Sequence, residues 1–191
     1  QTTGALIEIL GSPFAQLFAV GPTAIAVHPS GNLLFVTNNA NNPSAQGTLS
    51  VFIVQSTGFL DPVGSPLSLL LDPQALALNA TGTVVYVANK GNNSISTFSV
   101  DQNTGVLSPL SSPGGSSPAP SSLAVGPGGQ FLYVANSAGT ISWIPIDPVS
   151  GALISGGSNV VLASSEFIRI DPAGKLLYAT DSTSDLASIF S

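Results

Sequence analysis

Apolar residues in this chain come in short runs of five to eight, and glycine, proline, asparagine or aspartate interrupts each run. Within the runs β-branched and aromatic residues are frequent, and the spacing of an amphipathic helix is nowhere sustained. Short runs of this composition between turn residues are typical of β-strands. The pattern therefore predicts an all-β protein.

The strand pattern is repeated four times. A first strand and its hairpin turn recur as AIAVHPSG (24–31), ALALNATG (75–82), SLAVGPGG (122–129) and FIRIDPAG (167–174). A second strand follows each turn at once, a third is expected at 48–54, 94–100, 140–146 and 186–191, and a weaker fourth at 4–13, 58–66, 105–113 and 151–158. The glycines that begin the fourth segments, Gly58, Gly105 and Gly151, lie 47 and 46 residues apart. Four strands per unit at this period predict the blades of a β-propeller.

Turn residues recur at fixed places in each unit. Proline or alanine is followed two residues later by glycine in every hairpin, and glycine accepts the positive φ that a tight turn needs. At the end of the second strand stands Asn38, Asn89, Asn136 or Asp181. We expect these short polar side chains to cap the exit turn by accepting hydrogen bonds from backbone N–H groups.

The whole chain, 1–191, is predicted to be one β-propeller domain of four four-stranded blades, at about 14–64, 65–112, 113–158, and 159–191 together with 1–11. The chain begins with a fourth strand (4–10) and stops in a third (186–191), so the two ends are complementary. Three arrangements remain open. The N-terminal strand completes the last blade of the same chain, it completes a neighbouring subunit, or the sequence is a section of a longer array. Each leaves no bare strand edge.

Charge is scarce. Only 6% of the residues are charged, with nine Asp and Glu against three Lys and Arg and a net charge of -6. Three cations cannot build the basic patch that holds nucleic acid, and no run of eighteen apolar residues predicts membrane insertion. Cysteine is absent, which excludes disulfides and thiolate metal sites. A surface of uncharged polar residues favours a secreted protein, extracellular or at the cell surface.

The second strands also carry a family resemblance. LFVTNN, VYVANK and LYVANS, each preceded by the Pro/Ala-x-Gly turn, resemble the YVTN-type repeats of secreted surface-layer proteins and of lactonase-like seven-bladed propellers. The resemblance covers essentially the whole chain. It implies a propeller, and its lactonase-like side implies a hydrolase of which this chain is all or part.

One blade departs from the repeat. Arg169 stands where Ala26, Ala77 and Ala124 stand in the other first strands, and a buried guanidinium must be paired or must reach the central channel. Glu166 lies three residues earlier, and Asp181 and Asp185 belong to the same blade. We predict that these four residues form either a structural ion-pair group or a ligand-binding site.

Other candidates are weaker. His28 is the single histidine, so no His-based metal cluster can form within one chain. Its position in the hairpin predicts that it is a turn residue, so no Ser-His-Asp triad is expected either. No metal or cofactor is predicted. The acids beside turns are expected to cap them: Asp61, Asp72, Asp101, Asp147 and Asp171.

The leading functional prediction is a non-catalytic structural or adhesive propeller module that assembles with copies of itself by exchange of the N-terminal strand. A glycan or another cell-surface molecule is a second expected partner. The alternatives are a lactonase-like hydrolase and a propeller that binds a small ligand or glycan. The chain has one histidine and three Lys and Arg residues, which are few groups for acid–base or electrostatic catalysis, and this counts against an enzyme.

Overall fold

The computed structural model describes residues 8, 9, 12, 20–112, 115, 117–155, 157–161, 165–181 and 183–191. In this part of the chain the strands are β1 (Pro22–Val27), β2 (Leu33–Asn38), β3 (Gln46–Val54), β4 (Leu60–Pro62), β5 (Leu67–Leu71), β6 (Pro73–Leu78), β7 (Val84–Asn89), β8 (Ser94–Val100), β9 (Leu107–Pro109), β10 (Pro120–Val125), β11 (Phe131–Asn136), β12 (Thr140–Pro145), β13 (Ser158–Val161), β14 (Phe167–Ile170), β15 (Leu177–Asp181) and β16 (Leu186–Phe190). A 3₁₀ turn, η1 (Lys90–Asn92), joins β7 to β8. Across the same residues, no helix has the length and apolar character needed to cross a lipid bilayer.

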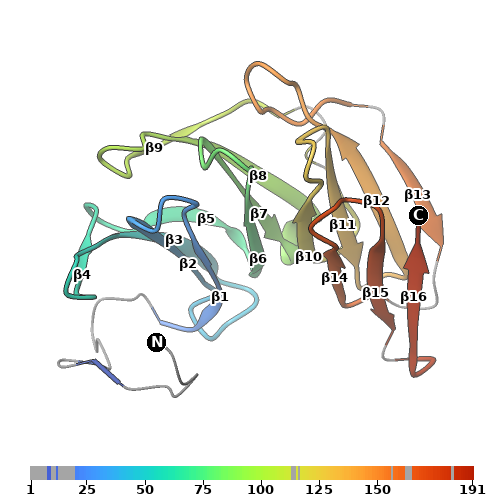
Figure 1. Cartoon of the computed structure of the whole chain (residues 1–191). Helices are drawn as coiled ribbons and strands as arrows, with labels where there is room; N and C mark the ends of the chain where they lie inside the picture. Colours follow the sequence, from blue (N-terminus) through green and yellow to red (C-terminus); the bar gives the residue numbers. More distant parts are fainter. Residues whose placement is uncertain are drawn as a thin grey trace.

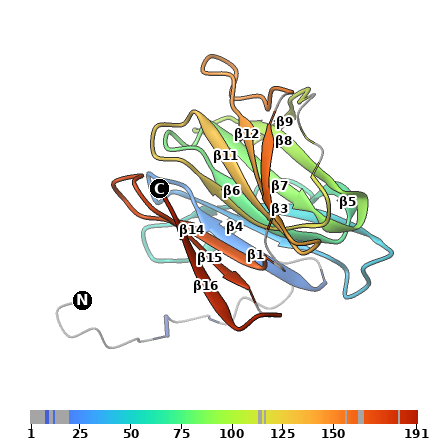
Figure 2. The same cartoon turned by 90° about the vertical axis from the view of Figure 1, so that its right-hand side faces the viewer.

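The strands form four antiparallel sheets, one for each repeat. Their orders are β1-β2-β3-β4 with β5 also on β3, β6-β7-β8-β9, β10-β11-β12-β13, and β14-β15-β16. We call them blades 1 to 4. Figures 1 and 2 show the blades packed face to face in an arc, with blades 1 and 4 at its two ends. The prediction of an all-β propeller of four blades is confirmed.

The hydrophobic core is divided among the junctions between successive blades. Phe35 and Val51 of blade 1 pack against Val85 and Val87 of blade 2. The next junction buries ten residues of blades 2 and 3, among them Tyr86, and a smaller cluster joins blades 3 and 4. Because a strand's side chains alternate between its two faces, a central blade must be apolar on both. This requirement explains the near-continuous apolar runs of the second strands.

Buried asparagines hold the second and third strands in register. Asn89 is fully buried, and its Nδ2 donates to the Ser96 hydroxyl at 2.9 Å. Asn136 donates in the same way to Ser142 at 2.8 Å, and Asn38 to Ser50 at 3.2 Å. Among the described residues, the predicted capping of backbone N–H groups is found only in blade 4, where the carboxylate of Asp181 accepts from Thr183 and Ser184. An amide can donate to a hydroxyl on the next strand, whereas a carboxylate can only accept.

The hairpin turns between first and second strands behave as predicted. In blade 2 the backbone N–H of Gly82 donates to the carbonyl of Asn79, and Gly82 has a φ of +74°. His28, at the corresponding position to Asn79 in blade 1, is buried, and its Nδ1 accepts from the N–H of Ser30 at 3.1 Å. Its ring lies where a side chain at Gly82 would lie. His28 is therefore a turn residue that also packs against the neighbouring turn.

The outer edge of each blade is less regular than its centre. β4 and β9 have three residues each, and in blade 3 the fourth segment makes a single bridge, Ile146 with Leu153. Two strands that the sequence did not predict, β5 and β13, continue the edge beside β3 and β12. In blade 1 the break between β4 and β5 contains Gly64, at a φ of +63°, and Pro66, which has no N–H to donate. The predicted N-terminal strand, 4–10, lies almost wholly outside the described residues.

Candidate functional site

The innermost strands of the four blades are β1, β6, β10 and β14, and successive members pack together along the hollow of the arc. On the face of each strand that looks toward the next blade, most residues are small: Ala24 and Ala26, Ala75 and Ala77, Ser122 and Ala124. Small residues there let neighbouring innermost strands approach closely. Blade 4 has Phe167 and Arg169 at the same two positions, so it carries bulk and charge where the other blades have neither.

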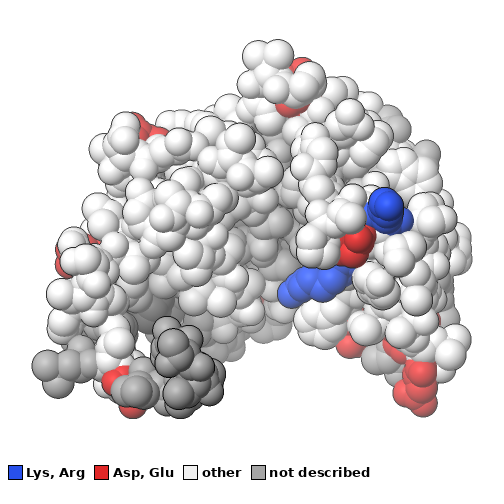
Figure 3. Space-filling view, in the orientation of Figure 1, with Lys and Arg blue, Asp and Glu red and all other residues white. Residues whose placement is uncertain are grey.

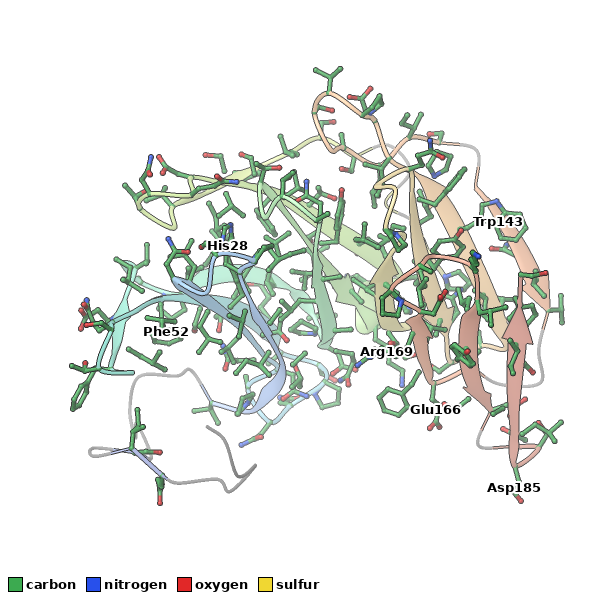
Figure 4. The ribbon with its side chains drawn as sticks, in the orientation of Figure 1. His28, Phe52, Trp143, Glu166, Arg169 and Asp185 are labelled. Carbon is green, nitrogen blue, oxygen red and sulfur yellow. The ribbon has the colours of Figure 1, made fainter. Side chains whose placement is uncertain are left out.

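Arg169 is exposed on β14 and points to the hollow of the arc (Figure 4). Its Nη1 donates to the backbone carbonyl of Ile168 at 2.7 Å. This bond uses one of the five N–H donors of a guanidinium. The side chain is exposed, so water or a ligand can reach it.

Glu166 directly precedes β14 and is half-buried. Its backbone is fixed on two sides: its N–H donates to the Thr180 carbonyl at 3.2 Å, and its carbonyl accepts from the Ser121 hydroxyl of blade 3 at 3.1 Å. Figure 4 shows Glu166 and Arg169 as neighbours at the inner edge of blade 4. The structure therefore brings these two predicted site residues into one region.

The other two predicted site residues lie at and after the end of β15, which is the end of blade 4 that also holds Glu166, because Phe167 pairs with Thr180. Asp181 is buried at the end of β15, where its carboxylate caps the turn that follows. Asp185 is exposed in the same turn, at a φ of +54°, and lies at the tip of the blade in Figure 4. The candidate site is thereby reduced to Glu166 and Arg169.

Asp72 is more than the turn cap that the sequence predicted. It is buried between blades 1 and 2, and its φ of +50° is a conformation that non-glycine residues rarely adopt. Its Oδ1 accepts from the Gln74 amide at 2.6 Å and from the Asn39 amide of blade 1 at 3.4 Å. The positive φ of Asp72 was not predicted from the sequence. Gly21 stands at the matching position of blade 1 and also has a positive φ, so this glycine could have indicated the unusual backbone conformation.

Three other acids are confirmed as turn caps. Backbone N–H groups hold the pKa of the carboxylates of Asp101, Asp147 and Asp171 below the usual value, and the largest causes are the N–H groups of Asn103, Ser150 and Leu176 respectively. Their charge serves the turns, so none of them is a candidate for proton transfer.

The surface between these sites carries little charge, as Figure 3 shows. A cavity of about 500 Å³ lies among the turns of blades 2 and 3, and one of about 280 Å³ lies between blades 3 and 4. Neither is lined by Glu166 or Arg169. Among the described residues, no group of three or more His, Cys, Asp or Glu side chains is placed to hold a metal ion.

Family comparison identifies the repeat. The family model described as "Lactonase, 7-bladed beta-propeller" matches residues 13–119 and 71–165. The chain belongs to this lactonase family. The YVTN-type surface-layer resemblance was not confirmed, and no curated protein sequence matched the chain.

Solved structures agree with the lactonase fold at low sequence identity. A putative 6-phosphogluconolactonase from Bacteroides uniformis matches with a TM-score of 0.72 and 17% identity, over 90% of this chain and 53% of that protein. A second one, from Bacteroides fragilis, matches with a TM-score of 0.71 and 18% identity, over 88% of this chain and 50% of that protein. The periplasmic gluconolactonase PpgL of Pseudomonas aeruginosa matches with a TM-score of 0.58 and 18% identity, over 92% and 67%. The chain thus spans about half the length of the first two.

Proposed function

We propose that this chain is part of a propeller that hydrolyses a sugar lactone, with Arg169 and Glu166 at the reacting ring. The observation that carries the proposal is Arg169, an exposed guanidinium on an innermost strand at a position where blades 1 to 3 have alanine. Membership of the lactonase family and the gluconolactonase-like neighbours support it. They favour this alternative over the structural or adhesive module that leads the sequence-based prediction.

The proposed chemistry needs one cation and one proton acceptor. The Glu166 carboxylate accepts a proton from a water molecule, whose oxygen adds to the lactone carbonyl carbon. The negative charge that develops on the carbonyl oxygen is stabilised by the guanidinium of Arg169. The ring C–O bond then breaks, and the departing ring oxygen takes the proton from Glu166. One lactone and one water give one hydroxy acid, without a metal or cofactor in the balance.

The test is acid release from δ-gluconolactone, measured by pH-stat titration and corrected for spontaneous hydrolysis. We expect the chain to accelerate ring opening. Arg169→Ala should lower kcat/KM at least about tenfold, because one charge-stabilising donor is worth that much or more. Arg169→Lys should retain part of the rate. Glu166→Gln should lower kcat. Each variant should keep the wild-type Tm, since both side chains are away from the core clusters.

Lys175→Ala is the matched control. It removes another cation of blade 4, from the hairpin between β14 and β15. It should leave hydrolysis unchanged. Wild-type protein that opens the lactone no faster than buffer, or an equal loss of rate in Arg169→Ala and Lys175→Ala, would refute the proposal.

A further inference from the structure

The turns of blades 2 and 3 enclose a cavity that the lactone site does not use. Its volume of about 500 Å³ lies within the range of about 300–1,000 Å³ that is typical of small-molecule sites. Its lining comes from the hairpin turn of blade 2 (79–83), the hairpin turn of blade 3 (127–130) and the outer turn of blade 3 (146–151). The outer turn lies in the loop between β12 and β13, drawn in orange at the top of Figure 1. Blades 2 and 3 are the two central blades, so the cavity does not lie at an end of the arc.

The corresponding place is filled at the other two junctions. Between blades 1 and 2, the His28 ring occupies the space that a Cβ on Gly82 would take. Between blades 3 and 4, Pro127 would lie 3.0 Å from a Cβ on Gly174. Gly129 is the matching glycine of blade 3, and a Cβ there would have no neighbour within 4 Å. The open space is therefore a local property of the junction between blades 2 and 3.

Asn79 leaves the space beside Gly129 open. It stands where His28 stands in blade 1. Its side chain is turned into its own hairpin, because its Nδ2 donates to the Thr83 hydroxyl at 2.9 Å and its Oδ1 accepts from the N–H of Val84 at 3.0 Å. An amide that is held at both polar atoms does not reach across the junction as the imidazole of His28 does.

Pro148 keeps the outer turn of blade 3 apart from its hairpin. The corresponding residue of blade 2 is Gln102, whose Nε2 donates to the carbonyl of Thr81 at 2.8 Å and so joins that outer turn to its hairpin. Proline has no side-chain donor, so blade 3 lacks this link. The outer turn of blade 3 is fixed from blade 2 instead, since the Tyr86 hydroxyl donates to the carbonyl of Gly151 at 2.7 Å. The cavity is thus held in shape by bonds within the protein.

The lining offers hydrogen-bond donors and acceptors for a ligand. The hydroxyls of Thr81 and Thr83 lie 2.9 Å apart, and only one of them can donate to the other, which leaves the second O–H for a ligand. The side-chain amide of Gln130 is exposed at the cavity and has no hydrogen bond to another described residue. Asp147 uses Oδ1 to accept from Val149 and Ser150, which leaves Oδ2 as an acceptor.

Charge and shape restrict the class of ligand. No Lys or Arg is among the described residues of the lining, so the carboxylate of Asp147 repels an anion. No aromatic side chain lines the cavity in the described part of the chain, so a planar base has nothing to stack on. Pro127, Pro148 and Val149 add apolar surface beside the polar groups. A neutral molecule with many hydroxyls and apolar C–H faces meets these conditions.

We propose that the cavity binds a neutral sugar unit, whose hydroxyls bond to the Gln130 amide and the Asp147 carboxylate while its C–H face lies on Pro127 and Val149. Neither Arg169 nor Glu166 lines this cavity. The sugar site is therefore separate from the proposed lactone site, and it does not depend on the hydrolysis of a lactone.

Binding is tested with the ¹⁵N-labelled full chain by nuclear magnetic resonance titration. The probes are the methyl α-D-glycopyranosides of glucose, galactose and mannose. At least one should shift the amide signals of Thr81, Gly128 and Gly129, with a dissociation constant on the order of 1 mM given the size of the ligand. Sodium gluconate at the same ionic strength should not shift them, because it is an anion. No shift of these signals with any of the three glycosides, or an equal response to gluconate, would overturn the proposal.

Filling the cavity should abolish binding. Asn79→His places an imidazole at the hairpin position where the chain already accommodates His28, and the ring should take the space beside Gly129. The variant should fold and lose the shifts caused by the glycoside. His28→Asn makes the reciprocal change at the junction of blades 1 and 2 and should bind with an unchanged dissociation constant. Undiminished binding by Asn79→His, or an equal loss in both variants, would contradict the proposal.

A milder substitution tests the polar contact without filling the cavity. Gln130→Ala should raise the dissociation constant about three- to tenfold, as expected for the loss of one hydrogen bond. Asn32→Ala is the matched control, because Asn32 is exposed at the same hairpin position of blade 1 and should leave binding unchanged. Equal dissociation constants for the two variants would refute the role of Gln130. These experiments measure binding and not ring opening, so the sugar site and the lactone site can fail separately.

Discussion

Blades 2 and 4 share one strand pattern but differ in what surrounds them. Every residue of β7 is buried, whereas the residues of β15 are alternately buried and exposed. Tyr86 and Tyr178 occupy the same column, and they are 0% and 42% exposed. Blade 2 has a neighbour on each face, and blade 4 has one described neighbour. The repeat therefore specifies a strand that is suited to burial on both sides, and the position of the blade decides whether both sides are used.

The largest expected difference between the two blades comes from this tyrosine pair. Tyr86→Ala should lower the free energy of unfolding by about 3–5 kcal/mol, because it empties a packed junction and removes the hydrogen bond to Gly151. Tyr178→Ala should cost less than about 1 kcal/mol, as surface substitutions do. Both are to be measured by urea unfolding. Equal losses would show that blade 4 is covered on its outward face within one molecule.

A smaller difference is expected between the hairpin glycines of blades 1 and 2. Gly31 and Gly82 have φ values of +77° and +74°, but a Cβ at Gly31 has no neighbour within 4 Å, and a Cβ at Gly82 would overlap the His28 ring. Gly31→Ala should cost about 1–2 kcal/mol for the backbone conformation alone. Gly82→Ala should cost about 1–3 kcal/mol more from the overlap. In a His28→Ala background the two losses should become equal, and urea midpoints measure both. An unchanged gap would show that the ring does not contact that turn.

The smallest effect should be the same in both blades. Because the pKa values of Asp101 and Asp171 are lowered on folding, the stability they contribute is present above the unfolded value of 3.8 and is lost as the pH falls through the lower folded value. Urea midpoints between pH 6 and pH 2.5 should therefore fall less steeply in Asp101→Asn and in Asp171→Asn than in the wild type. A similar change in the two variants is expected, since each cap bonds only to its own turn. A change confined to one of them would show that the blade's neighbours affect the cap.

The sequence predicted the centre of each blade better than its edges. The first three strands of each repeat combine a dense apolar pattern with fixed turn residues, and β1 to β3, β6 to β8, β10 to β12 and β14 to β16 are all present. The fourth segments have fewer apolar residues, and the short strands β5 and β13 carry no repeated signal. The role of the asparagine column was also wrong in three of the four blades. Whether the asparagine side chain donates or accepts depends on the residue that the strand register places opposite it. The repeat pattern alone does not show that the opposite residue is a serine hydroxyl.

The candidate site was predicted only in part. Arg169 was selected because it replaces alanine in a repeated column, and Glu166 was selected because it lies three residues earlier in the sequence. Asp181 lies at the same end of blade 4 as Glu166, but its carboxylate caps the turn after β15, and Asp185 is exposed at the tip of the blade. Asp72 was underestimated, since its two amide partners come from another segment and another blade. The predictions of a secreted location and of a glycan or cell-surface partner remain predictions.

The third-strand serine that each buried asparagine contacts belongs to the same blade. The contact that aligns a second strand with its third thus needs no residue of a neighbouring sheet. A unit with such an internal reference can be duplicated, lost or moved along a gene while its strands still meet correctly. Related proteins can then differ in the number of blades, because the aligning contact lies within each blade. The connecting loops can vary in length for the same reason.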